Sequence, residues 1–119
     1  MTKTVLVVDD QPGIRMLLEE VIKTEGYHIL LAQTGQEAID QVTQHQPDLM
    51  LVDLKLPIKD GLTVVRELEE ENRIVPTIIM SGLAEDELVG KKFSSNIKGV
   101  IAKPFNIQDV RELIIGQLE

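Results

Sequence analysis

The chain has 119 residues, of which 43% are hydrophobic, 27% charged and only 3% aromatic, which fits one soluble domain with an aliphatic core. The formal net charge of −8 argues against direct binding to nucleic acid or to anionic membranes, since both need a basic face. The absence of cysteine excludes disulfides and thiolate metal sites. No segment suits a signal peptide, and no apolar run approaches the roughly 20 residues of a membrane span, so we expect a cytoplasmic protein.

Short apolar runs alternate along the chain with amphipathic stretches, which predicts strands followed by helices. In chain order, the predicted elements are a strand at 4–9, a helix at 13–26, a strand at 27–32, a helix at 34–46, a strand at 48–54, a helix at 60–72, a strand at 76–81, a helix at 85–96, a strand at 98–102 and a helix at 106–118. Gly26 is expected to stop the first helix. Thr34, with Glu37 as its capping-box partner, and Asn106 are expected to begin later helices.

The regular alternation of strands and helices predicts a parallel sheet with helices on both of its faces. The whole chain, residues 1–119, is expected to form one such domain, because we find no linker, repeat or low-complexity tract. In open sheets of this class, ligands bind beyond the carboxyl ends of the strands. The residues at the strand ends are therefore the first candidates for a functional site.

Five polar residues follow or end the predicted strands, namely Asp9, Asp10, Asp53, Ser81 and Lys103. Each alone has an ordinary explanation, such as a solvated loop or a surface turn. In a parallel sheet, however, all five meet at one edge, and three clustered carboxylates suit a hard cation such as Mg²⁺. A carboxylate beside Mg²⁺ can attack a phosphoryl group, while the lysine and the hydroxyl contact its remaining oxygens. The pattern predicts a site that forms an aspartyl phosphate.

Short motifs occur in a fixed order along the chain. They are VDD at 8–10, Asp53 followed by Pro57 and by DG at 60–61, Ser81, and KPF at 103–105. Over its whole length the chain resembles the receiver domains of response regulators in two-component signalling. The stretches DDQPGIRMLLEEVIKTEGY and KPFNIQDVRELI are most similar to the single-domain intermediates of sporulation phosphorelays. The resemblance implies a flavodoxin-like, doubly wound (βα)5 fold with strand order 2-1-3-4-5.

The resemblance also implies roles for the acidic residues. Asp53 is the implied phosphoacceptor, and Asp9 and Asp10 are implied to hold Mg²⁺. The direct metal ligands are implied to be Asp10, Asp53 and the backbone carbonyl of Lys55.

Two further residues have roles that the resemblance implies. Ser81 is the implied switch hydroxyl, and Lys103 is implied to contact the phosphoryl group. The bond between Lys103 and Pro104 is implied to be cis.

The chain departs from the family pattern near the switch. Val100 stands where the family often has an aromatic residue, which argues against a rotamer switch at that position because valine is short and stiff. Gly82 replaces the usual alanine and opens the phosphoryl site. Gly90 weakens the predicted helix at 85–96, which we expect to be mobile.

The function implied is that of a single-domain response regulator rather than a classical enzyme. It would accept a phosphoryl group from a histidine kinase or a histidine phosphotransferase and act on a downstream protein, as a monomer. The expected docking surface is the exposed face of the first helix, formed by Gln11, Gly13, Ile14 and Leu18, although Ile14 and Leu18 could instead be core residues. The face formed by 85–96, 98–102 and 106–118 is a second candidate.

Three other functions are weighed against this one. An aspartyl-phosphate phosphatase of the haloacid dehalogenase type needs Asp-x-Asp, whereas Asp9 and Asp10 are adjacent. A flavodoxin-type flavin binder needs a phosphate cradle after the first strand, where this chain has two carboxylates. A degenerate receiver that docks without phosphorylation remains the alternative.

Overall fold

The computed structural model describes residues 2–82 and 94–119, and strands and helices alternate through most of this range. The elements are β1 (Thr4–Val8), α1 (Pro12–Thr24), β2 (His28–Ala32), α2 (Gly35–His45), β3 (Leu49–Asp53), α3 (Gly61–Glu70), β4 (Thr77–Ser81), β5 (Ile97–Ala102) and α4 (Ile107–Leu118). All five predicted strands are confirmed, with ends that differ from the prediction by no more than one residue.

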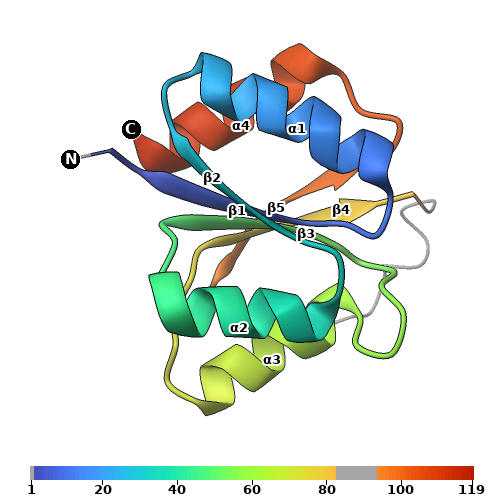
Figure 1. Ribbon diagram of the computed structural model, residues 1–119, viewed down its shortest axis with the longest axis vertical. Helices are drawn as coiled ribbons and strands as arrows, with labels where there is room; N and C mark the ends of the chain where they lie inside the picture. The colour runs from blue at the N-terminus through green and yellow to red at the C-terminus, as the bar shows by residue number, and fades with distance from the viewer. Residues whose placement is uncertain (1, 83–93) are drawn as a thin grey trace.

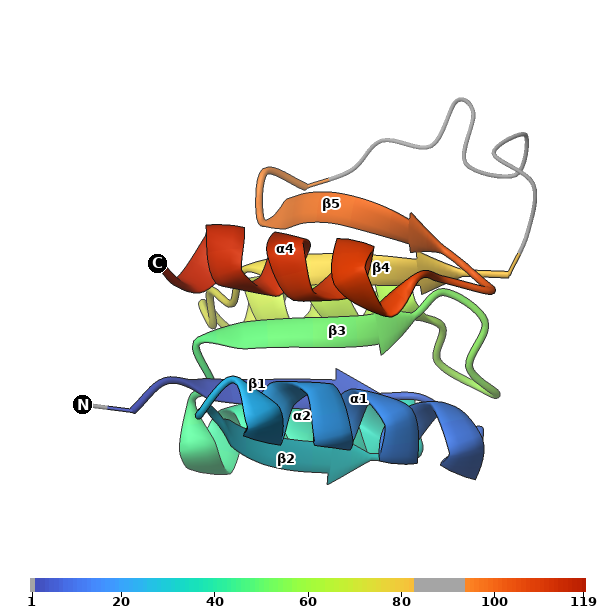
Figure 2. The same ribbon diagram turned by 90° about the horizontal axis from the view of Figure 1, so that it is seen from above.

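The strands form one parallel sheet in the order β2-β1-β3-β4-β5. Helices α1 and α4 cover one face and α2 and α3 cover the other (Figure 1). This arrangement confirms the predicted doubly wound fold. All strand arrows point to the same side in Figure 2, so the carboxyl ends of the strands share one edge of the molecule.

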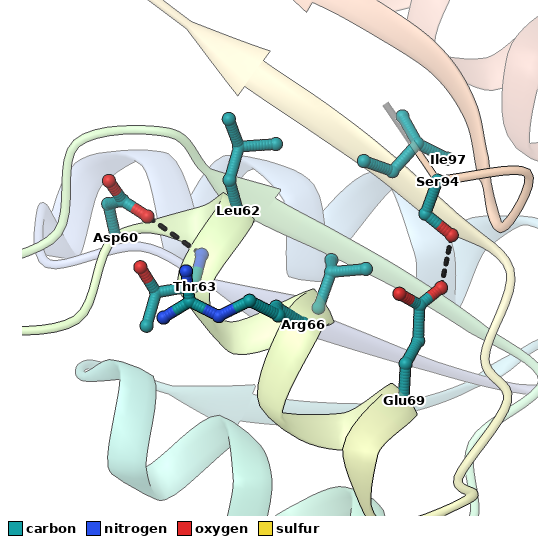
Figure 3. A pocket seen from close by; sticks show the side chains of 8 residues that line it. Asp60, Leu62, Thr63, Arg66, Glu69, Ser94 and Ile97 are labelled. Carbon is teal, nitrogen blue, oxygen red and sulfur yellow. Dashed lines mark hydrogen bonds between the residues drawn. The ribbon is translucent and has the colours of Figure 1, made fainter. Parts of the chain in front are cut away.

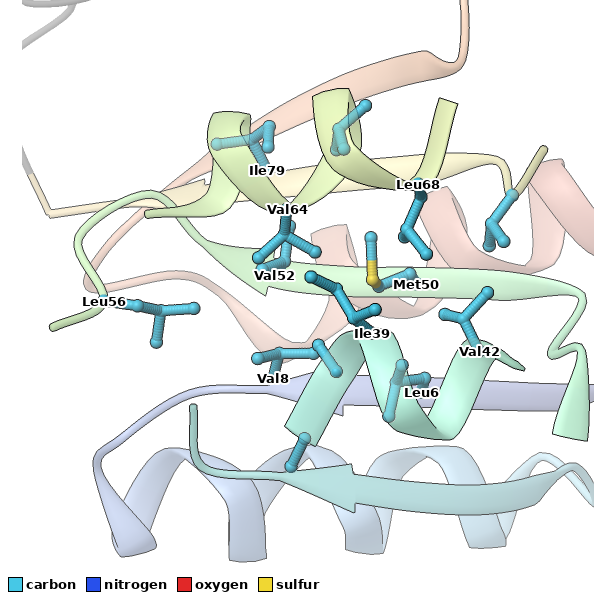
Figure 4. Close-up of a cluster of buried hydrophobic side chains, with 14 of the residues drawn as sticks. Leu6, Val8, Ile39, Val42, Met50, Val52, Leu56, Val64, Leu68 and Ile79 are labelled. Carbon is cyan, nitrogen blue, oxygen red and sulfur yellow. The ribbon is translucent and has the colours of Figure 1, made fainter. Parts of the chain in front are cut away.

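The central strands are apolar except at their end residues, because both of their faces are covered. Successive residues of β1 enter different clusters: Val7 packs with Leu18 and Ile22 of α1, whereas Val8 packs with Ile39 of α2. We call these the α1–α4 cluster and the α2–α3 cluster; Figure 4 shows the second. With the backbone held between two cores, the strand ends have little freedom to move.

Side-chain caps begin three of the helices. Thr34 Oγ1 accepts the backbone N–H of Glu37 at 3.1 Å, and Asn106 Oδ1 accepts that of Gln108 at 2.7 Å, so both predicted N-caps are confirmed. Asp60, which was predicted to lie inside a helix, caps α3 instead. Such caps satisfy backbone donors that the first helical turn leaves without a partner.

The first helix begins earlier than predicted, at Pro12 rather than at residue 13. Proline suits the first helical position because its fixed φ is helical and its missing N–H would have no partner there. The helix ends at Thr24, two residues before the end of the predicted range, with Glu25 as its C-cap. Gly26 follows at a φ of 87°, which fits its predicted part in stopping the helix.

Most of the predicted helix 85–96, including Gly90, lies outside the described residues. The described end of that range is a turn rather than a helix. Ser94 Oγ and Asn96 Nδ2 both donate hydrogen bonds to Glu69 on α3, and the chain then enters β5. Within residues 2–82 and 94–119, no helix combines the length and apolar character needed to cross a bilayer.

Candidate functional site

The predicted site residues meet at the carboxyl edge of the sheet. Asp9 and Asp10 follow β1, Asp53 and Ser81 end β3 and β4, and Lys103 follows β5. Carboxylate oxygens of the three aspartates lie within 4.8 Å of one another. Asp9 is 0% exposed and Asp53 is 6% exposed, whereas Asp10 is open to solvent. The parallel topology therefore brings together residues from distant parts of the chain, as the sequence predicted.

Lys103 joins two of these carboxylates. Its Nζ donates to Asp9 Oδ2 at 2.6 Å and to Asp53 Oδ2 at 3.1 Å. The backbone N–H of Lys103 donates to the carbonyl of Ser81 at 2.7 Å, which fixes the lysine next to the end of β4. The Lys103–Pro104 bond is cis, as expected. One ammonium thus offsets part of the repulsion within the acidic cluster.

The pKa values at the site reflect competition between burial and charge. Burial raises the pKa of Asp53 above its usual value, and the ammonium of Lys103 opposes this only in part. Burial alone would lower the pKa of Lys103, but hydrogen bonds to Asp9 and Asp53 outweigh it and raise the pKa. Lys103 is therefore a fixed cation at neutral pH. Asp53 is a carboxylate whose charge is poorly solvated, which makes it more basic than an aspartate in water.

Backbone and side-chain donors orient the acidic residues. The N–H of Gln11 donates to Asp9 Oδ1 at 2.9 Å, and that of Lys55 donates to Asp53 Oδ1 at 3.3 Å. Arg15, which the sequence analysis missed, donates from Nη1 to the backbone carbonyl of Asp9 at 2.8 Å. A cation near the N-terminus of a helix interacts unfavourably with the helix dipole. The position of Arg15 near the start of the predicted first helix was therefore a signal in the sequence that this residue has a specific partner.

The donor set fits a hard divalent cation. Several carboxylate oxygens close together and partly exposed to solvent are what Mg²⁺ uses in proteins, where it keeps some of its waters. Both oxygens of Asp9 already accept hydrogen bonds, from Gln11 and Lys103, whereas Asp10 faces solvent. A direct role for Asp10 and Asp53, and for the carbonyl of Lys55, stays a prediction.

Ser81 and Gly82 lie where β4 meets the acidic cluster. Ser81 is buried, at 1% exposure. A Cβ at Gly82 would lie 4.0 Å from the Cβ of Lys103, which is ordinary van der Waals contact, so an alanine would fit there. The glycine therefore leaves room beside Lys103, at the place where the sequence predicted it. Val100, the other departure from the family pattern, is 40% exposed on β5.

The predicted docking face of α1 needs correction. Gln11 and Gly13 are exposed and Ile14 is half-buried against the α1–α4 cluster, but Leu18 is fully buried, so its predicted place on the exposed face is wrong. Leu18 packs in that cluster because its side chain faces the sheet. The exposed apolar side chains of this helix are instead Met16, at 69%, and Leu17, at 36%.

A cavity of about 510 Å³ lies between α3 and the start of β5 and does not include the acidic cluster (Figure 3). Its lining contains the cap from Asp60 to Thr63 and the contact between Glu69 and Ser94. The first satisfies a backbone N–H of α3, and the second joins two side chains. Because Ser94 adjoins residues outside the described part of the chain, we assign this cavity no function.

Comparisons with known proteins agree with this geometry. The family model of the response regulator receiver domain matches residues 5–115. Sporulation initiation phosphotransferase F of Bacillus subtilis is 36% identical over 114 residues, which cover 96% of this chain and 92% of that protein.

Two solved structures share the fold. A CheY-like receiver domain from Methanospirillum hungatei has a TM-score of 0.89 and 26% identity, and the match covers 99% of this chain and 94% of that one. The response regulator TrrA from Thermotoga maritima, solved in complex with Mg²⁺-BeF, has a TM-score of 0.85 and 30% identity, with 98% of this chain and 100% of that chain covered. The chain belongs to the family of response regulator receiver domains.

Proposed function

We propose that this chain accepts a phosphoryl group on Asp53, with Mg²⁺, and passes the signal on by docking to other proteins. The observation that carries the proposal is the joining of Asp9 and Asp53 by Lys103, inside a cluster of three carboxylates. Family membership supports it, as does a relative named as a phosphotransferase. The solved complex of TrrA with Mg²⁺-BeF supports the use of Mg²⁺.

The reaction would use Asp53 as the nucleophile. One of its carboxylate oxygens forms a bond to phosphorus while the bond from phosphorus to the donor's imidazole nitrogen, or to an acyl oxygen, breaks. The bonding electrons leave with the donor, which then holds or takes up a proton. Bound Mg²⁺ would reduce the repulsion between the carboxylate and the incoming phosphoryl oxygens.

Lys103 is placed to stabilise negative charge both before and after the transfer. Its ammonium holds Asp53 Oδ2 at 3.1 Å before transfer, and afterwards the same cation can contact a phosphoryl oxygen. Its second bond, to Asp9 at 2.6 Å, keeps the ammonium in the cleft throughout. Ser81, at the end of the neighbouring strand, is proposed as the hydroxyl that responds to the phosphoryl group.

The proposed partners are a histidine kinase or a histidine phosphotransferase as donor, and a downstream protein as target. The exposed residues at the start of α1, Gln11 and Gly13, lie next to Asp9 and Asp10 in the chain and so border the cleft. Met16 adds an exposed apolar side chain to the same helix. We propose this end of α1 as part of the docking surface, with Ile14 only partly accessible.

Labelling with a small phosphodonor tests the acceptor directly. Incubation with acetyl phosphate and Mg²⁺ should add one phosphoryl mass to the intact chain, and Asp53→Asn should abolish it. Asp40→Asn, at an exposed position of α2, is the matched control and should be labelled like the unmodified chain. Undiminished labelling of Asp53→Asn would refute the assignment. A wild-type chain that takes no label would favour docking without phosphorylation.

A further inference from the structure

Ile58, in the loop between β3 and α3, has an unusual conformation for its residue type. Its φ is 68°, and its exposure is 103% of the reference value, so its side chain is fully open to solvent. A β-branched residue at positive φ is a genuine outlier, because its side chain crowds the backbone. Glycine or asparagine usually occupies such positions.

A tight turn causes this conformation. The N–H of Lys59 donates to the carbonyl of Pro57 at 2.7 Å, which closes a three-residue γ-turn around Ile58. The form of this turn with positive φ at its centre is rare and strained. Strained residues persist where the surrounding structure holds them, so the neighbours of the turn decide whether it can relax.

The neighbours fix Lys59 firmly. Its Nζ donates to Gln36 on α2 and to Glu67 on α3, at 2.9 Å in each case. It also packs against Gly35, where an added Cβ would lie only 2.7 Å from the Cβ of Lys59 and 2.8 Å from its backbone oxygen. Two helices therefore hold the residue after Ile58, and the turn cannot open without breaking these contacts.

The base of the loop lies against the acceptor. The N–H of Gly61 donates to the carbonyl of Leu54 at 3.0 Å and closes the loop. A Cβ at Gly61 would lie 2.7 Å from the backbone oxygen of Asp53. Figure 2 places this loop and the N-terminal turn of α1 at the same end of the molecule, where the strands end. Ile58 is thus an apolar residue presented beside the acceptor cleft.

The fold gains nothing from this side chain. A fully exposed isoleucine buries no apolar surface against the described residues, and its conformation is strained. A residue that is both unfavourable and exposed is understandable if it acts on another molecule. A protein that brings a phosphohistidine within bonding distance of Asp53 must cover this end of the molecule. A second copy of the chain is disfavoured, because two acidic clefts would face each other.

We propose that Ile58 inserts into an apolar socket on the protein that donates the phosphoryl group to Asp53, and so helps to select that donor. This inference rests on the proposed function. A small donor has no socket, so the residue should matter only when the donor is a protein. The rate of transfer from a protein, divided by the rate from a small donor, isolates the contribution of the docking contact.

The experiment compares two donors that share the same phosphorus–nitrogen bond. One is phosphoramidate; the other is the autophosphorylated cytoplasmic part of a histidine kinase, chosen because it labels the wild-type chain. Ile58→Asn, which suits positive φ but is polar, should lower the ratio of the kinase rate to the phosphoramidate rate about tenfold. Ile58→Met keeps an apolar side chain and should largely preserve the ratio. Ile74→Asn, at an exposed isoleucine beyond α3, is the matched control and should leave the ratio unchanged.

Melting temperature provides a second readout. Ile58→Asn relieves the backbone strain and should raise the melting temperature by about 3–6 °C. A lower melting temperature would mean that the fold needs the isoleucine, which overturns the inference. An unchanged rate ratio in Ile58→Asn overturns the inference as well. The molecule that Ile58 contacts would then be a downstream target or a second copy of the chain. If no histidine kinase and neither phosphoramidate nor acetyl phosphate labels the wild-type chain, the proposed function itself is wrong.

Discussion

At the scale of single residues, the three clustered aspartates differ in how the protein holds them. Asp9 is fully buried, and its two oxygens accept hydrogen bonds from Gln11 and Lys103. Asp53 also accepts a hydrogen bond from Lys103. Asp10 is exposed to solvent and lies close enough to both to repel them. Removing Asp10 should therefore relieve repulsion at little structural cost, whereas removing Asp9 would leave the partly buried ammonium of Lys103 with one partner fewer.

Asp10→Ala is predicted to raise the melting temperature of the metal-free protein and to remove most of its response to Mg²⁺. In the wild-type chain, Mg²⁺ at ten times its Kd should add about 1.4 kcal/mol to the free energy of unfolding, because it binds only the folded cleft. Thermal melts with and without Mg²⁺ measure both effects. A full Mg²⁺ shift in Asp10→Ala would contradict its role as a ligand.

The sequence predicted the convergence of the site residues but not their finer placement. Asp53 and Lys103 follow from topology alone, because parallel strands end at one edge. Leu18 was misplaced because helical spacing does not tell which of two neighbouring leucines faces the sheet, and here Leu17 is the exposed one. The positive φ of Ile58 was not predicted, because isoleucine disfavours it and the γ-turn that sets it is seen only in the structure.

At the scale of elements, the start of helix α3 packs with its backbone directly against the backbone at the end of strand β3. The first residue of α3 is Gly61, and a Cβ there would lie 2.7 Å from the backbone oxygen of Asp53 and 3.3 Å from the Cα of Leu54. Neither atom can move aside without moving the strand. Only glycine lets the helix begin this close to Asp53.

Gly61→Ala is predicted to lower the free energy of unfolding by about 2–3 kcal/mol, because it overpacks the joint between α3 and β3. The matched change Gly116→Ala lies in helix α4, where no described atom outside the helix's own backbone and the adjacent residues comes within 4 Å of the added Cβ. That change should instead stabilise the protein by up to about 1 kcal/mol, since alanine favours helix. Urea unfolding of both variants tests the contrast, which fails if the two changes have the same sign.

The ends of the helices were largely predictable, because the signals that set them are local. Thr34 and Asn106 cap their helices through contacts that span two or three residues. The start of α1 was missed by one residue, although Pro12 was a local signal for it. The strand order, in contrast, could not be predicted from local signals. The alternation of strands and helices predicts only a parallel sheet, and the predicted order came from the family resemblance.

At the scale of the whole molecule, one contact links the end of α4 to the turn before β2. The hydroxyl of Tyr27 donates to Glu119 Oε2 at 2.5 Å, and Arg111 forms an ion pair with Glu25 at 2.8 Å nearby. The hydrogen bond to Glu119, together with burial and nearby negative charge, raises the pKa of Tyr27 from 10.0 to about 12. The hydrogen bond spans 92 residues of sequence and lies at the end of the molecule opposite the carboxyl ends of the strands.

Tyr27 is the only tyrosine and there is no tryptophan, so its ionisation can be followed by ultraviolet absorbance. We predict a midpoint near pH 12 in the folded chain and a midpoint closer to 10 in Glu119→Gln. Because the folded-state pKa is the higher one, the contact stabilises the fold fully below pH 10 and loses this effect as pH rises towards 12. Equal midpoints in the two proteins would show that Glu119 does not bind the hydroxyl.

The two clusters on either side of the sheet also shape how the chain can accept mutations. Val7 and Val8 are adjacent in sequence, and both are fully buried, yet one belongs to the α1–α4 cluster and the other to the α2–α3 cluster. Changes in stability usually add when two residues lie more than about 7–10 Å apart and share no partners, and they couple when the side chains touch. Substitutions at Leu18 of α1 and Ile39 of α2, which lie in different clusters on opposite faces of the sheet, are therefore expected to have nearly independent energetic costs, whereas substitutions at Val8 and Ile39 should depend on each other. The helices on one face can thus diverge in sequence while the packing on the other face, and the strand ends between them, stay as they are.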